Sequence, residues 1–141
     1  MKIIIPYPLL DGIQNHGESS YPEEGAGLML GYEKDGKRYI ADLLYLENSR
    51  ENTARHNRYL ITAEDMLQAE NKAEQLGLSI MGIFHSHPNH PNQPSEFDRE
   101  NAVPWYSYLI TSVINAKASG SRSWRLAEDR SSFLPEEIEV K

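Results

Sequence analysis

The stretch Ser79-Ile80-Met81-Gly82-Ile83-Phe84-His85-Ser86-His87-Pro88 predicts the strand around which the rest of the fold is arranged. Side chains alternate along an extended chain, so Met81 and Ile83 are expected on one face. Ile80 and Phe84 are expected on the other face. A strand that is apolar on both faces lies in the middle of a sheet, covered on each side. Its polar end then opens into a cleft, where ligand sites tend to occur.

Turn and cap signals divide the rest of the chain into further strands and helices. The Asp35-Gly36 pair lies between two apolar runs and predicts a hairpin. Thr62 and Asp65 match a capping box, and apolar residues follow at helical spacing until Gly77 ends the helix. Short helices over 9–13 and 95–103, and strands over 2–5, 27–32, 38–46, 58–61, 106–114, 123–126 and 138–140, complete the prediction. The predicted fold class is α/β, a single domain over residues 1–141 with a mixed β-sheet flanked by helices.

The composition supports a folded globular protein. Of 141 residues, 39% are hydrophobic and 25% are charged. The net charge of -7, without a basic stripe, argues against nucleic acid and anionic membranes as partners. The sequence has no cysteine, so any zinc site must use nitrogen and oxygen ligands. The apolar run at the start is shorter than a signal peptide requires, and no stretch is long enough to span a bilayer. We therefore expect a cytoplasmic protein.

Two histidines lie at the end of the predicted central strand. His85 and His87 share one face, roughly 7 Å apart along the strand, so their ring nitrogens are able to converge on one ion. The alternative is a pair of ordinary polar residues at a strand end, one hydrogen-bonded and one exposed. The buried strand before them favours a ligand site.

The next candidate ligand follows after a proline-rich loop. Ser95 and Asp98 match a capping box, which by itself explains both residues. Asp98 is alternatively a third metal ligand, because two imidazoles and one carboxylate hold a divalent metal and leave a position open for water. The two roles are partly compatible: we expect Ser95 and Asp98 to fill only one of them at a time, but a helix start is a rigid support for a ligand. Three competing ligands are expected to face solvent: His90, Glu96 and Glu100.

A hydrolytic site also needs a base, and the best candidates lie far upstream. Glu23 and Glu24 immediately precede a glycine-rich, apolar strand. The residues alone do not distinguish a catalytic role from that of a charged turn. His16 and His56 have no nearby partners in the sequence, and we assign no role to either.

The combined pattern resembles the motif of JAMM (MPN-plus) zinc metalloprotease domains of the short prokaryotic type. The matching residues are Glu24, then His85-Ser86-His87-Pro88, then Ser95-Glu96-Phe97-Asp98. The upstream segment is similar to the family pattern Pro-x-Glu-x-Cys-Gly-Leu-Leu-Leu-Gly, which selects Glu24 over Glu23. Ala26 stands where many members have Cys. The resemblance covers roughly residues 2–127 and implies the JAMM/MPN (cytidine-deaminase-like) fold.

The resemblance also implies a site and a reaction. His85, His87 and Asp98 would bind a single zinc ion, Glu24 would take a proton from water, and the Ser95 side chain would help to stabilise the oxyanion. The implied substrate is a peptide or isopeptide bond at the C-terminal tail of a ubiquitin-like or sulfur-carrier protein. Residues 47–57 are interpreted as a substrate-contacting flap or, equally, as a plain solvated loop. The oligomeric state is not indicated.

Two other functions remain open. Two histidines and one carboxylate are also the ligand set of non-haem Fe(II) oxygenases, although that chemistry does not need a base such as Glu24. The second alternative is a non-catalytic interaction scaffold of the MPN type. The intact motif argues against it.

Overall fold

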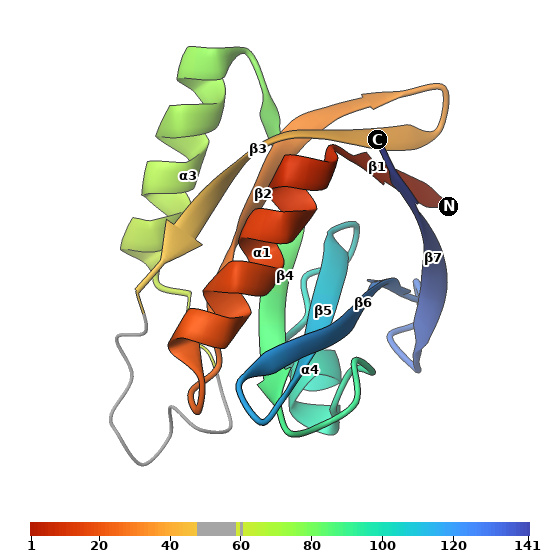
Figure 1. Ribbon diagram of the computed structural model, residues 1–141. Helices are drawn as coiled ribbons and strands as arrows, with labels where there is room; N and C mark the ends of the chain where they lie inside the picture. The colour runs from red at the N-terminus through yellow and green to blue at the C-terminus, as the bar shows by residue number, and fades with distance from the viewer. Residues whose placement is uncertain (48–58, 60) are drawn as a thin grey trace.

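The computed structural model describes residues 1–47, 59 and 61–141. The strands and helices follow in the order β1 (Lys2–Ile5), α1 (Tyr7–Ser20), β2 (Ala26–Lys34), β3 (Lys37–Leu46), α3 (Ala63–Leu76), β4 (Ser79–Pro88), α4 (Glu96–Asn101), β5 (Ser107–Ile114), β6 (Lys117–Leu126) and β7 (Phe133–Val140) (Figure 1).

The strands form one mixed sheet that closes on itself in the order β1-β3-β2-β4-β5-β6-β7. The strand β4 pairs antiparallel with β2 and parallel with β5, which confirms its predicted central position. The short strand β1 pairs in parallel with both β3 and β7 and so closes the sheet. Sequence analysis predicted the mixed sheet but not this closure.

The helices α1 and α3 pack against different faces of the sheet. Leu28 and Leu30 of β2 lie in one hydrophobic cluster with α3, and Met29 between them lies in a second cluster with α1. Figure 1 shows the two helices on opposite sides of β2 and β4. In the described part of the chain, no helix is both long enough and apolar enough to cross a membrane.

A β-bulge in β4 corrects the predicted faces of this strand. Met29 of β2 pairs with Gly82, whereas the next residue, Leu30, pairs with Ile80, so Met81 is the extra residue. The bulge reverses the alternation. Ile80 therefore lies in the α3 cluster with Ile83, and Met81 lies in the α1 cluster with Phe84. The predicted pairs, Met81 with Ile83 and Ile80 with Phe84, were wrong.

Local signals located most elements correctly. The Asp35-Gly36 hairpin joins β2 to β3, with both residues at positive φ, and Thr62 and Asp65 form the predicted capping box. Of the predicted strand over 58–61, Tyr59 and Ile61 are not in a strand, and residues 58 and 60 lie outside the described residues. The helix α4 ends at Asn101, two residues before the predicted end, and β6 starts earlier than predicted. Residues 48–57 of the predicted flap lie outside the described residues.

Candidate metal centre

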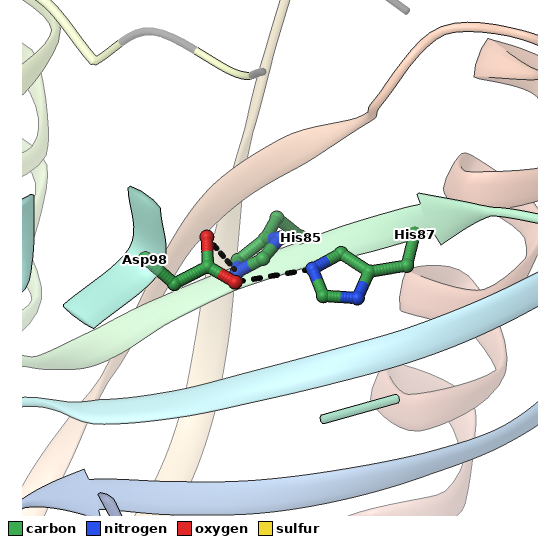
Figure 2. A group of neighbouring side chains, drawn as sticks. All are labelled: His85, His87 and Asp98. Atoms are coloured by element: carbon green, nitrogen blue, oxygen red, sulfur yellow. Dashed lines mark hydrogen bonds and ion pairs between the residues drawn. The ribbon is translucent and has the colours of Figure 1, made fainter. Parts of the chain in front are cut away.

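The end of β4 and the start of α4 bring together two imidazoles and a carboxylate. The side chains of His85, His87 and Asp98 are all buried, and one potential ligand atom from each lies within 4.8 Å of the others. Figure 2 shows both imidazoles directed at the Asp98 carboxylate. The structure thus gathers the three residues that the sequence analysis selected as metal ligands.

The distances between the ligand atoms fit tetrahedral coordination. His87 Nε2 lies 3.1 Å from Asp98 Oδ2, and His85 Nε2 lies 3.6 Å from Asp98 Oδ1. Ligand atoms about 2.0–2.1 Å from a tetrahedral zinc ion are separated from one another by about 3.3–3.4 Å. Each imidazole faces a different oxygen of the Asp98 carboxylate, and both observed separations are close to this value.

The hydrogen bonds of His87 leave a lone pair directed at the carboxylate. His87 Nδ1 lies 2.8 Å from the Pro91 carbonyl oxygen, an acceptor, so the ring proton belongs on Nδ1. In the neutral ring, Nε2 then carries a lone pair and faces Asp98 Oδ2, which is also an acceptor. Two acceptors at this distance need either a proton or a metal ion between them. A carbonyl on the far nitrogen is also the usual partner of a metal-bound histidine.

His85 is held in a different way. Neither of its ring nitrogens has a hydrogen-bond partner among the described residues. Burial lowers the pKa of His85 to about 4, against the opposing effect of Asp98, so the ring is neutral at pH 7, as metal binding requires. The Tyr59 ring stacks on it, with centroids 4.4 Å apart. Sequence analysis did not find this contact, and no local pattern around Tyr59 signals it.

Asp98 acts as a helix cap and as part of the cluster at the same time. Its Oδ2 accepts a hydrogen bond from the Ser95 N–H (2.8 Å) while also facing His87. Sequence analysis expected only one of these roles to be filled at a time. They coexist because a carboxylate accepts about four hydrogen bonds or metal bonds. Burial opposes ionisation of Asp98, but His85, His87 and the Ser95 N–H outweigh it, and the pKa of Asp98 lies below its ordinary value.

The candidate base and the candidate oxyanion donor lie beside this cluster. One cavity of about 370 Å³ is lined by Glu24, His87 and Ser95. Its wall also includes His90, Pro91, Gln93 and Pro94. Glu24 is buried, whereas Glu23 is half-buried. The carboxylate selected by the family resemblance is therefore the one at the cavity wall.

The other candidates lie apart from the three clustered side chains. Glu96 and Glu100 are exposed on α4, as predicted. His90 is exposed and stands at the cavity wall. His16 is not isolated, since it packs against the rings of Tyr45 and Phe84. His56 lies outside the described residues.

Comparisons with known proteins agree with this geometry. A family model described as prokaryotic homologs of the JAB domain matches residues 6–127. A probable TtuB-protein conjugate cleaving protease of Thermus thermophilus is 29% identical over 118 residues, which cover 84% of this chain and 75% of that protein. A desampylase of Pyrococcus furiosus is 40% identical over 65 residues, covering 46% of this chain and 44% of that protein.

Solved structures share the fold. Protein DSY2949 of Desulfitobacterium hafniense superposes with a TM-score of 0.85 at 26% identity, covering 99% of this chain and 92% of that one. The JAB1/MPN domain protein AF2198 of Archaeoglobus fulgidus superposes with a TM-score of 0.61 at 20% identity, covering 100% of this chain and 96% of that one. The second likeness establishes the fold alone and confirms the JAMM/MPN architecture expected from the sequence.

Proposed function

Because this chain belongs to the family of prokaryotic homologs of the JAB domain, we propose that it is a zinc-dependent peptidase that cleaves a peptide or isopeptide bond at the C-terminal tail of a ubiquitin-like or sulfur-carrier protein. We also propose that residues 1–141 act as one domain, since β1 and β7, near the two ends of the sequence, pair with each other.

One observation carries this proposal. Glu24 is distant in the sequence from His87 and Ser95, yet all three line the same cavity, next to the cluster of His85, His87 and Asp98. A metal site needs only the cluster, and a capped helix needs only Ser95 and Asp98. Neither a metal site nor a helix cap requires the buried Glu24 carboxylate at the same cavity wall. Hydrolysis, in contrast, requires a base at this position.

The names of two relatives support the proposed substrate class. One is named for cleaving conjugates of the protein TtuB, and the other is named a desampylase. The first name describes the cleavage of a protein conjugate. By analogy, we propose that this chain acts on a carrier protein whose C-terminal tail is joined to another group through its carboxylate.

Glu24 would serve as the base and then as the acid. A zinc ion held by His85, His87 and Asp98 would lower the pKa of a bound water towards 7 and polarise the scissile carbonyl. The Glu24 carboxylate, at the cavity wall, accepts the proton of the attacking water and delivers it to the leaving amine.

Ser95 is placed to stabilise negative charge on the carbonyl oxygen. Its Oγ accepts the Asp98 N–H (3.1 Å), so the hydroxyl hydrogen remains available to a substrate in the cavity. A donor aimed at a developing oxyanion contributes more in the transition state than in the ground state. Because the donor is part of a helix cap, it is fixed before the substrate arrives.

The test is cleavage of carrier proteins extended beyond their C-terminal tail, incubated with the zinc-loaded protein and followed by intact mass. We expect one cut directly after the tail. Glu24→Gln should keep its zinc and lose about 10²–10⁴-fold in turnover, while the control Glu23→Gln should stay active. Full activity of the Glu24→Gln variant would exclude Glu24 as the base.

The metal content tests the alternative function. Iron in the purified protein, with absorbance changes on adding a keto acid, would favour the oxygenase alternative.

A further inference from the structure

Ser86, between the two histidines, faces away from the metal centre. It is buried (2% exposed) on the side of β4 that α1 covers. A Cβ atom added at Gly17 of α1 would lie only 3.2 Å from the Ser86 Cβ, so helix and strand are in close contact here. Ser86 therefore has no direct contact with a metal ion held by its neighbours.

The Ser86 hydroxyl takes part in the last pairing between β2 and β4. Beyond the pair Ala26–His85, Gly25 stands opposite Ser86, and the Ser86 N–H donates to the Gly25 carbonyl oxygen (3.0 Å). The Gly25 N–H donates to Ser86 Oγ (2.8 Å) and not to a backbone carbonyl. Ser86 thus forms hydrogen bonds with both the N–H and the carbonyl oxygen of Gly25.

Gly25 is confined from its other side by α1. A Cβ atom added at Gly25 would lie 2.6 Å from Ser20 Oγ and 3.1 Å from His16 Cδ2. The backbone at this point therefore packs closely against side chains of α1. Glu24 immediately precedes Gly25 in the chain, so its Cα position relative to the two histidines depends on the Gly25–Ser86 pair.

We propose that Ser86 is a positioning residue: its hydroxyl, through Gly25, sets the position of the Glu24 carboxylate relative to His85 and His87. This inference rests on the proposed function, because it assigns Glu24 a catalytic task. A purely structural role, in which the hydroxyl only satisfies a buried N–H, predicts a loss of stability without a selective loss of turnover.

Thr111 provides a matched control. It pairs with Ser86 across the neighbouring strand β5, is fully buried, and its hydroxyl bonds to Ser121 (2.7 Å) instead of Gly25. We compare Ser86→Ala with Thr111→Val in three measurements: zinc bound per chain, kcat and KM for carrier cleavage, and hydrogen exchange of the Gly25 amide by NMR. If Ser86→Ala does not fold, Ser86→Cys, which keeps a weaker acceptor, replaces it.

We expect Ser86→Ala to bind zinc as the wild type does, to exchange the Gly25 amide at least about 10-fold faster, and to lose about 10–100-fold in kcat with little change in KM, because small misplacements of a catalytic group cost this much. Thr111→Val should show none of these changes. An unchanged kcat, an unchanged Gly25 amide, or an equal kcat loss in Thr111→Val would overturn the inference. A wild-type protein without activity would overturn the proposed function instead, and the Gly25 exchange rate would still test the link between Ser86 and Gly25.

Discussion

Ser95 and Asp98 cap each other across the first turn of α4. The Asp98 N–H donates to Ser95 Oγ (3.1 Å), and the Ser95 N–H donates to Asp98 Oδ2 (2.8 Å). The same Oδ2 faces His87 Nε2 at 3.1 Å. One reciprocal pair of hydrogen bonds therefore fixes a proposed metal ligand and a proposed oxyanion donor together, so the helix start supports the chemistry of both residues.

Replacing Asp98 by Asn should abolish tight zinc binding. The substitution removes the negative charge and one of the two oxygens that face the histidines. We expect the zinc affinity to fall more than about 100-fold, because losing a ligand costs more than the 10–100-fold typical of an outer-shell partner. Competition with a chromophoric chelator measures it. Glu96→Gln, an exposed neighbour in the same turn, is the control. Unchanged affinity in Asp98→Asn would remove Asp98 from the ligand set.

Ser95→Ala should affect stability and turnover separately. Loss of the cap costs about 0.5–2 kcal/mol in the free energy of unfolding, and loss of the oxyanion donor costs about 10²–10³ in kcat. Ser95→Thr keeps a hydroxyl for both tasks and should restore both values. Urea unfolding and carrier cleavage measure the two effects. If the Ala variant loses stability but retains full kcat, Ser95 is a helix cap only.

The sequence predicted elements whose signals are local. The capping boxes at Thr62 and Ser95 and the Asp35-Gly36 hairpin each depend on a few neighbouring residues, and all three are present. The strand prediction failed at Tyr59 and Ile61, the described residues of 58–61, for the opposite reason. Tyr59 and Ile61 pack against the α3 cluster, and their apolar character reflects burial without a partner strand. A run of apolar residues therefore predicts burial, but by itself it does not predict that the segment pairs with another strand.

The arrangement of the candidate site depends on how the strands pair, which the spacing of residues in the sequence does not show. The bulge at Met81 shifts the register between β2 and β4, and this register brings Gly25, next to Glu24, opposite Ser86. A bulge arises from the fit of two strands, so neither strand shows it alone. The choice of Glu24 over Glu23 required the family pattern, and the stacking of Tyr59 on His85 required the fold itself.

Gly82, beside this bulge, should tolerate no side chain. A Cβ atom there would lie 2.0 Å from the carbonyl oxygen and 2.8 Å from the carbonyl carbon of Ser107, which belong to the backbone of β5. A paired backbone cannot yield as a side chain does, so Gly82→Ala should lose about 3 kcal/mol or more of unfolding free energy.

The comparison for Gly82→Ala is Gly36→Ala in the β2–β3 turn. Gly36 has a φ of +76° and no neighbouring atom within 4 Å of an added Cβ. Its substitution should cost only the strain of the left-handed conformation, about 1–2 kcal/mol. Urea unfolding of both variants measures the difference. Equal losses would show that the contact with Ser107 is not limiting.

His16 should make the stability of the protein depend on pH. Its ring packs against Tyr45 and Phe84, and its buried Nε2 has no hydrogen-bond partner within the described ranges. Burial lowers the pKa of His16, against the opposing effect of the Ala26 and Leu46 backbone. In the unfolded chain the ring has a pKa near 6.5. Below that pH the unfolded state binds more protons than the folded state, so stability is full above about pH 6.5 and declines as the pH falls towards the lower folded value.

The variant His16→Gln isolates this effect. It loses the ring packing, so at pH 7.5 its Tm should be a few degrees below that of the wild type. Because it carries no titrating ring, the difference should shrink as the pH is lowered to 5. His90→Gln, in the exposed loop, should follow the wild-type profile. Thermal unfolding of the zinc-loaded proteins at several pH values measures this, and a gap that stays constant from pH 7.5 to 5 would mean that His16 does not couple protonation to unfolding.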